Sequence, residues 1–318
     1  MDLLPVRFFK INSFVVESWV IILLIVFLGF VFIRPWDVKA RSFHDKRVRR
    51  VTSVTITPTP TLTPTPTPTI ELKQFANSFA SDNTIEETGS MSESSSRDWW
   101  LNSGGYFMTQ DGVGMTVHGS LPMLDKWRLL YSFSNPLDTD GGYYPQNIFR
   151  LVTQSKWKNF NQQVYFKIQK DNLSESPQRN ASNGVLMFNR YLDGNNLYYT
   201  GVRVDGGVVI KKKINGEYFT LGYRKYWDGS YDRGINPNLL PKEKWIGVKS
   251  ELISALDDSV TIRLYLDVGR TSNWELVLQV TDKGNSFGIA PIQGEGFGGI
   301  RSDFMDVQFD DYKISEMK

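Results

Sequence analysis

The sequence predicts an all-β fold, a sandwich of two antiparallel sheets, for the C-terminal two thirds of the chain. Three observations predict it: polar and apolar residues alternate in short runs, turn-forming pairs separate the runs, and no stretch has the apolar spacing of a long amphipathic helix. The clearest run is SVTIRLYLDVG, in which every second residue from Val260 to Leu266 is aliphatic. Such alternation is typical of a strand with one buried face.

Asp-Gly and Asn-Gly pairs mark the turns between strands. NLYYTGVRVDGGVVIKKKINGEYFTLGY is predicted to form three strands joined at Asp205-Gly206 and Asn215-Gly216, because such pairs supply the positive φ that tight hairpins need. A closed barrel is the alternative that this pattern leaves open. The other predicted strands are residues 105–109, 113–117, 127–133, 147–153, 162–169, 184–190, 244–252, 273–281, 296–302 and 306–314.

Composition excludes several classes of function. The 318 residues include 36 Lys and Arg against 34 Asp and Glu, a net charge of +2 that is too balanced for binding nucleic acid through bulk charge. The chain has no cysteine, which excludes disulfides, thiol catalysis and cysteine-ligated metals. Its two histidines exclude a multi-histidine metal site.

A membrane anchor is predicted near the N-terminus, after a short tail of residues 1–13. Residues 14–33, FVVESWVIILLIVFLGFVFI, are apolar apart from Glu17 and Ser18. Twenty helical residues span about 30 Å, the thickness of the hydrocarbon core, so the lipid bilayer is an expected partner. A cleaved signal peptide is the alternative.

The segments that follow the predicted anchor give conflicting evidence on location. Residues 34–56 form a basic juxtamembrane segment, which by the positive-inside rule favours a cytoplasmic position. Residues 57–98 are predicted to be a disordered linker, because they begin with the Thr-Pro tract TPTPTLTPTPTPT and are then Ser-rich. Extended Thr-Pro stalks are typical of domains held away from a cell surface, and we therefore expect an extracytoplasmic C-terminal domain.

Three segments of residues 99–318 resemble the concanavalin A-like lectin/glucanase superfamily, which includes laminin G-like domains. WIGVKSEL followed by SVTIRLYLDVG resembles its Trp-led strand pair, NRYLDGNNLYYTGVRV its central sheet, and GFGGIRSDFMDVQFDDYKI its closing strand. The resemblance implies a jelly roll, one sheet of which often binds carbohydrate. Members of this superfamily include lectins, glycoside hydrolases, polysaccharide lyases and adhesion modules.

No catalytic motif of that superfamily is evident in the sequence. The E-x-D-x-x-E strand of its retaining glucanases is absent, as are the R-x-E and Gln-Ile/Val-His strands of its alginate lyases. Retaining hydrolysis needs two nearby carboxyl groups, whereas a lyase needs a base and a cation for the uronate. Whether the chain is an enzyme stays open.

Alternation places several candidate ligand-binding side chains on shared strand faces. Tyr165 and Lys167 share one face, Tyr199 and Arg203 a second, and Lys211 and Lys213 a third. Together they are predicted to line a groove for a glycan, the alternative being an ordinary solvated sheet face. The loop aromatics Tyr144 and Trp227 are further candidates, because flat rings stack on sugars. Covering the edges of the sandwich is the alternative role for these two.

A structural calcium ion is predicted at Asp310 and Asp311, at the end of the last strand. Asp311 has the same parity as its apolar neighbours, and a buried carboxylate needs a cation, an ion pair or amide donors. Asp138-Thr139-Asp140-Gly141 is predicted to be a turn, because the later ligands of a calcium loop are missing.

These observations predict a membrane-anchored, surface-displayed module that binds a glycan or envelope polysaccharide. A glycan-cleaving enzyme of the same fold, a lyase or a hydrolase, is the first alternative. A structural envelope or adhesion protein is the second.

Overall fold

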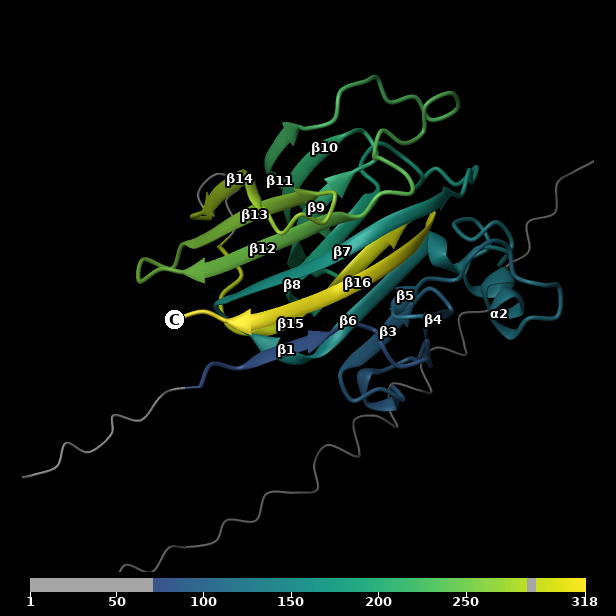
Figure 1. Cartoon of the computed structure of the whole chain (residues 1–318), viewed down its shortest axis with the longest axis horizontal. Helices are drawn as coiled ribbons and strands as arrows, with labels where there is room; N and C mark the ends of the chain where they lie inside the picture. The colour runs from purple at the N-terminus through teal and green to yellow at the C-terminus, as the bar shows by residue number, and fades with distance from the viewer. Residues whose placement is uncertain (1–70, 285–289) are drawn as a thin grey trace, which may run out of the picture. The chain divides into compact units, whose positions relative to one another are not determined.

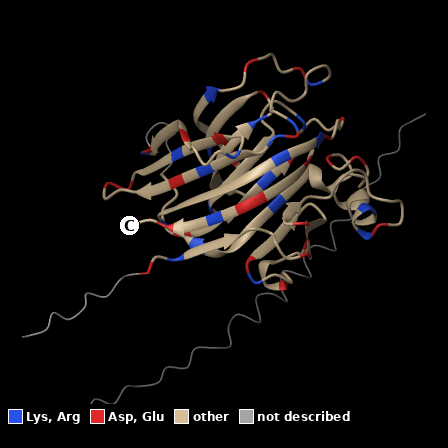
Figure 2. Ribbon diagram, in the orientation of Figure 1, with Lys and Arg blue, Asp and Glu red and all other residues tan. Residues whose placement is uncertain are grey.

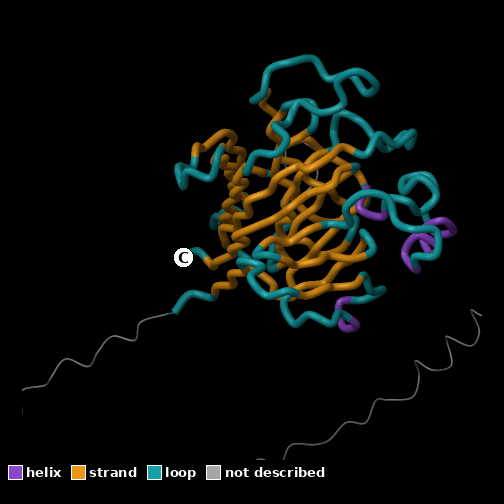
Figure 3. The backbone as a smooth tube through the Cα atoms, turned by 45° about the vertical axis from the view of Figure 1, so that its right-hand side comes forward, coloured by secondary structure: helices purple, strands orange, loops and turns teal. Residues whose placement is uncertain are grey.

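Alternating apolar residues build two antiparallel sheets, and the predicted all-β sandwich is confirmed (Figure 1). The computed structural model describes residues 71–284 and 290–318, which lie within one compact unit of residues 67–318. In Figure 3 the strands are orange, and the helices of the described residues lie at one side of them in purple.

The first sheet has nine strands, with the C-terminal strand β16 near its middle. Its order is β14-β13-β12-β7-β16-β5-β4-β2, and β1 also pairs with β16. The bounds of these strands are β1 Gln74–Asn77, β2 Asn83–Glu86, β4 Tyr106–Gln110, β5 Val113–Met115, β7 Phe160–Asp171, β12 Ile246–Ser254, β13 Val260–Val268, β14 Glu275–Asp282 and β16 Met305–Glu316.

The second sheet has seven strands in the order β11-β10-β9-β8-β15-β6-β3. Its β9-β10 and β10-β11 hairpins are those predicted from the Asp-Gly and Asn-Gly pairs, and Asn215 and Gly216 have φ of 50° and 87°. The bounds of these strands are β3 Trp99–Ser103, β6 Ile148–Trp157, β8 Gly184–Asp193, β9 Asn196–Arg203, β10 Gly207–Ile214, β11 Glu217–Lys225 and β15 Gly296–Asp303.

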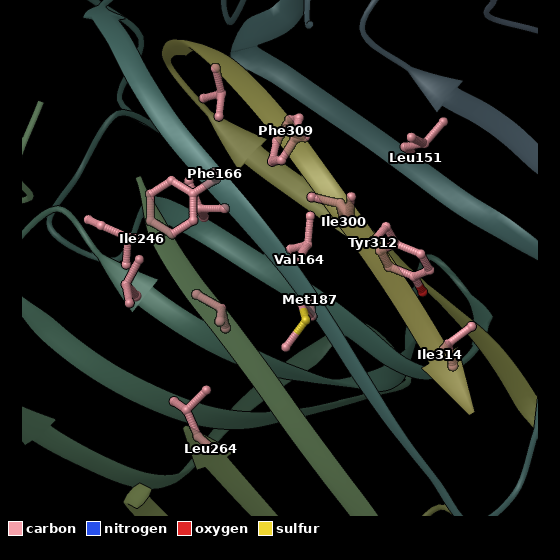
Figure 4. Close-up of a cluster of buried hydrophobic side chains, with 14 of the residues drawn as sticks. Leu151, Val164, Phe166, Met187, Ile246, Leu264, Ile300, Phe309, Tyr312 and Ile314 are labelled. Carbon is pink, nitrogen blue, oxygen red and sulfur yellow. The ribbon is translucent and has the colours of Figure 1, made fainter. Parts of the chain in front are cut away.

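The main core lies between the two sheets. Figure 4 shows side chains from both, among them Phe166 and Phe309 of the nine-stranded sheet and Met187 and Ile300 of the seven-stranded sheet. Along the central strands, alternate residues point into this core and are buried. Full burial of one Val, Leu, Ile, Phe or Met side chain stabilises a fold by about 1.5–3 kcal/mol. This core fixes which side chains of each sheet point outward.

The predicted strand at residues 127–133 is wrong, because this segment is the helix α2, Lys126–Ser134. The Asp125 carboxylate accepts hydrogen bonds from the backbone N–H groups of Trp127 and Arg128, which caps the helix. Trp127 and Tyr131, four residues apart, are its buried side chains. The buried side chains are thus four positions apart, as on one face of a helix, and do not alternate along the segment as in a strand.

The predicted linker is also wrong for residues 74–98, which contribute to the fold. β1 pairs with β16 and β2 pairs with β4, and the short 3₁₀ helix η2, Met91–Glu93, follows them. Phe75 and Phe79 contact the Trp99 ring with centroids 5.5 and 6.4 Å apart. These few apolar residues anchor a segment whose composition is mostly polar.

The predicted tail, anchor, basic segment and Thr-Pro tract, residues 1–70, lie outside the described residues. Among residues 71–284 and 290–318, no helix has both the length and the apolar character needed to cross a bilayer.

Candidate functional site

The candidate site lies on the outer face of the seven-stranded sheet. Tyr198 of β9 and Ile210 of β10 face the core, so their neighbours Tyr199 and Lys211 project from the opposite face. Tyr199 and Lys211 are also directly opposite each other in the β9-β10 register. The hairpin thus places an aromatic ring and an amine side by side, away from the core.

A cavity of about 430 Å³ opens on this face. It is lined by side chains from six strands of the sheet, β6, β8, β9, β10, β11 and β15, and by two loops, residues 138–147 and 178–183. Its lining is rich in amides, hydroxyls and charges: Asp138, Asn147, Ile148, Arg150, Gln178, Asn180, Ser182, Asn183, Leu186, Tyr199, Lys211, Tyr218, Arg301, Asp303 and Phe304.

Two stacked tyrosines form one wall of the cavity. The rings of Tyr199 and Tyr218 have centroids 6.0 Å apart with an interplanar angle of 26°. Tyr199 is buried, whereas Tyr218 is 52% exposed. Tyr218 therefore offers an accessible ring, with Tyr199 as its support.

Arg301 contacts both the aromatic pair and Asp303, an acid in the cavity lining. Its guanidinium carbon lies 5.3 Å from the Tyr199 ring centroid, and its Nε donates to Asp303 Oδ1 at 2.8 Å. Burial opposes ionisation of Tyr218, but Arg301 and then Lys213 outweigh it, so the pKa of Tyr218 lies below its usual value near 10. Burial and Tyr218 raise the pKa of Tyr199 to about 12.

Lys211 and Arg150 are two further cations in the lining of the cavity. Among the described residues, neither side chain has a hydrogen bond or an ion pair, although Lys211 is only 9% exposed. Burial, followed by repulsion from Arg203 and Arg301, lowers the pKa of Lys211 to about 8. An amine in this position gains from an anion.

An apolar cluster covers the outer face beside the cavity. Phe188, Leu197 and Val209 are buried there, and Trp100 and Phe297 pack against them. This part of the face is closed by its own side chains, and the cavity opens next to it, where Leu186 and Tyr199 of the same cluster form part of the lining.

Four of the predicted ligand-binding residues lie on this face, and two of these line the cavity. Tyr199 and Lys211 are in the lining. Arg203 lies beside it and pairs with Asp205 at 2.6 Å, and Lys213 lies over the Tyr218 ring at 4.8 Å. The predicted shared faces of β9 and β10 are therefore correct.

Tyr165 and Lys167 do not belong to the same groove, and this part of the prediction is wrong. Both lie on β7 of the nine-stranded sheet and face away from the core, on the opposite side of the sandwich. The Tyr165 hydroxyl donates to Asp267 Oδ2 at 2.7 Å, and the Lys167 amine lies 5.0 Å from the Trp245 ring centroid. The main core separates them from Tyr199.

The two predicted loop aromatics lie outside the cavity lining. Tyr144 precedes the 3₁₀ helix η3, Pro145–Asn147, and its ring centroid is 6.4 Å from that of Tyr143. Trp227 contacts Tyr226 edge to face at 4.7 Å and packs against the main core. Covering an edge of the sandwich is the role that the structure gives Trp227.

The carboxylates of Asp310 and Asp311 face a guanidinium. Arg270 Nη2 lies 2.6 Å from Asp310 Oδ2 and 2.7 Å from Asp311 Oδ2. The salt bridge is thus the arrangement observed at the predicted calcium ligands. Within the part of the chain that the structure describes, no three His, Asp or Glu side chains are grouped closely enough to hold a metal ion.

Asp306 has a neighbourhood that suits a hard cation better. Its buried carboxylate accepts hydrogen bonds from Gly119 N, Gln146 Nε2 and Asn172 Nδ2 at 2.8–2.9 Å, with no ion-pair partner among the described residues. The buried oxygens Gln146 Oε1 and Asn172 Oδ1 have no hydrogen-bond partner within the described part of the chain. Amide and carboxylate oxygens are the ligands that Ca²⁺ prefers.

Arg150, Tyr218, Arg301 and Asp303 are cavity residues that sequence reasoning missed. Arg301 lies opposite Arg150 in the β15-β6 register, although the two are far apart in the sequence. Of these four, only Tyr218 could have been found from the local sequence. It follows the predicted Asn215-Gly216 turn and lies opposite Lys213 in the β10-β11 hairpin.

Comparison with known proteins finds similarity only among solved structures. No family model and no curated protein matches the chain. The carbohydrate-binding module CBM66 from Bacillus subtilis is 13% identical with a TM-score of 0.41, over 68% of this chain and 94% of that one. The Bacillus licheniformis β-glucanase is 10% identical with a TM-score of 0.39, over 77% and 98%.

The Ca²⁺/Man-bound exoplasmic/lumenal domain of VIP36 is a third similar structure. It is 10% identical with a TM-score of 0.38, over 77% of this chain and 91% of that one. The two antiparallel sheets of the described residues fit the fold that the sequence resembles. In architecture, the described residues form an antiparallel two-sheet sandwich, as the sequence resemblance implies.

Proposed function

We propose that this protein binds a glycan in the cavity on the outer face of its seven-stranded sheet. The observation that carries the proposal is the half-exposed Tyr218 ring beside a cavity lined by amides, hydroxyls and charges. An aromatic ring stacks on the apolar face of a sugar, and the convergent polar groups hydrogen-bond its hydroxyls. The loop amides of Gln178, Asn180 and Asn183 suit that second task.

A glycan panel tests this proposal. The full-length chain, purified in detergent, is applied to neutral and acidic oligosaccharides, and we expect binding to at least one class. Failure of a natively melting chain to bind any glycan would remove the proposal and leave a structural envelope or adhesion role.

We also propose that residues 14–33 anchor the protein in a membrane and that the Thr-Pro tract displays the module outside the cell. The support is sequence composition: an apolar run long enough to span a bilayer, followed by an extended proline-rich tract. External protease on intact cells should remove the C-terminal module. Its full protection, with a control surface protein cleaved, would place the module inside.

A glycan-cleaving activity is a second candidate, favoured by the lowered pKa of Tyr218 beside Arg301. The Tyr218 phenolate would take the proton α to a uronate carboxylate, the β C–O bond to the leaving sugar would break as the C=C bond forms, and the newly protonated tyrosine or a water would protonate the departing oxygen. Incubation with acidic polysaccharides would then give ultraviolet-absorbing unsaturated products, which Tyr218→Phe should abolish while binding persists. Constant absorbance with a binding-competent chain would exclude a lyase.

We propose that a structural Ca²⁺ is held by Asp306, Gln146 and Asn172. Rotation of the two amides would turn their unpartnered oxygens towards a cation beside the Asp306 carboxylate. A saturating ion should stabilise the fold by about 2–3 kcal/mol through mass action, and so raise Tm by roughly 4–12 °C.

Thermal melts with Ca²⁺ and with EDTA check this prediction. The shift should disappear in Asp306→Asn and persist in Asp310→Asn, whose carboxylate pairs with Arg270. The same melting temperature for the unmodified chain in both buffers would count against the ion.

A further inference from the structure

Positive charge at the glycan cavity exceeds what its own acids neutralise. Arg150, Lys211 and Arg301 line it, against Asp138 and Asp303. Arg301 is paired with Asp303, while Asp138 accepts hydrogen bonds from Ser176 Oγ at 2.5 Å and Asn135 Nδ2 at 3.1 Å. Among the described residues, Arg150 and Lys211 therefore form no ion pair, although Glu87 attracts Arg150 and Asp303 attracts Lys211 at longer range.

Holding these cations together is costly for the free protein. Lys211 is 91% buried, because its exposed fraction is 9%, and its amine has no hydrogen-bond or ion-pair partner among the described residues. Arg203 and Arg301 both repel it. A buried unpaired charge is unfavourable, so an anion entering the cavity would relieve a cost already present in the fold.

The shape of the cavity limits what this anion can be. Its volume of about 430 Å³ suits a small molecule or one or two sugar units, and the Tyr218 ring forms part of its lining. Amide side chains complete the lining, and they match hydroxyl groups. The ligand therefore combines a ring face, hydroxyls and one negative group.

We infer that the cavity is selective for an acidic sugar, whose carboxylate or sulfate group is bound by Arg150 and Lys211. This inference rests on the proposed glycan-binding function and adds the substrate class. A free guanidinium can bind a carboxylate through two parallel hydrogen bonds, and the amine adds a second charge-assisted contact.

Binding of such a ligand should weaken as the pH rises through 8. The pKa of free Lys211 is about 8, and a bound anion raises it, so binding takes up a proton above that pH. The charged and titratable groups around Lys211 come from five elements: Arg203 and Tyr199 of β9, Tyr218 of β11, Arg301 and Asp303 of β15, Arg150 of β6, and Asp138 of the loop. Of these, Tyr218 also ionises at alkaline pH and would weaken binding in the same direction.

Affinity measurements on the full-length chain in detergent test the inference. The probes are an oligogalacturonate, a sulfated oligosaccharide and a neutral oligosaccharide of equal length, at one pH below and one above 8 and at low and high salt. We expect an acidic probe to bind at least about tenfold more tightly than the neutral one below pH 8, with salt reducing the difference. The carboxylated and sulfated probes identify which acidic group is preferred.

Three variants locate the effect. Lys211→Met should lower the affinity for the acidic probe by about tenfold or more at the lower pH, and the affinity should then depend little on pH. Lys211→Arg should still bind the acidic probe at the higher pH, because a guanidinium stays protonated there. Arg150→Gln should weaken binding at both pH values. Lys249→Met is the matched control, because Lys249 lies over the Tyr265 and Trp274 rings of the other sheet.

The outcomes separate this inference from the proposed function. Equal affinity for neutral and acidic probes would overturn acidic selectivity while glycan binding stands. Acidic binding that Lys211→Met and Arg150→Gln both leave unchanged, in variants that melt normally, would also overturn it. Absence of binding to every probe would remove both proposals.

Discussion

Replacing Lys212 by methionine is expected to lower the free energy of unfolding by about 3–5 kcal/mol. Its amine lies 2.8 Å from Asp282 Oδ2, and both side chains are almost completely buried. Lys212 is on β10 and Asp282 is on β14, so the pair joins the two sheets. Without the amine, the buried carboxylate would keep the Tyr198 hydroxyl and the Gly284 N–H as its donors among the described residues.

Thermal and denaturant unfolding of the full-length chain measure this loss, which corresponds to a fall in Tm of roughly 6–20 °C. Lys213→Met, the next residue along β10, should change stability by less than about 0.5 kcal/mol. Removing both charges in Lys212→Met/Asp282→Leu should restore much of the stability, because no unpaired charge is left. If Lys212→Met alone is as stable as the unmodified chain, the Lys212–Asp282 pair does not stabilise the sandwich.

Tyr218→Ala is expected to reduce glycan affinity by about tenfold to a hundredfold with little change in stability. Tyr218 is 52% exposed in the cavity, so its ring is available for stacking and contributes little to the core. Loss of an aromatic platform of this kind costs about 1–3 kcal/mol, by analogy with aromatic stacking on nucleic-acid bases.

Tyr223→Ala provides a matched control for this change. Tyr223 lies on the same strand, β11, and is 43% exposed, but it is outside the cavity lining. Its removal should leave affinity within about twofold in the same titration. Equal losses in the two variants would mean that the ligand is not seated at the cavity.

The alternation of polar and apolar residues was sufficient to predict strand faces where two strands are joined by a tight turn. The alternation of β9 and β10 correctly predicted that Tyr199 and Lys211 project from one face, because the hairpin fixes their register through the turn at Gly206. The C-terminal strand and the β12-β13 pair were predicted for the same reason: each has one aliphatic face over many residues.

Pairing between distant segments could not be predicted from the same pattern. Tyr165 alternates on β7 just as Tyr199 does on β9, yet the two strands belong to different sheets. Arg301 and Arg150 meet only because β15 pairs with β6. Alternation gives the face of a strand, whereas membership of a sheet depends on contacts between residues far apart in the chain.

The sequence-based prediction also failed for segments that are short or contain few apolar residues. Trp127 and Tyr131 suit either a strand or a helix, and the Asp125 cap decides for the helix. Phe75 and Phe79 are too few to mark β1 and the turn after it within a polar segment, but their packing on Trp99 anchors both.

Hydrogen–deuterium exchange of the full-length chain, with and without saturating oligogalacturonate, tests the position of the binding site most directly. Ligand bound in the cavity should slow exchange in residues 217–225 of β11 and in the loops at residues 138–147 and 178–183. The strands of the opposite outer face, β7, β12 and β13, should exchange unchanged. Protection confined to those three strands, with none at the cavity, would contradict a glycan site on the seven-stranded sheet.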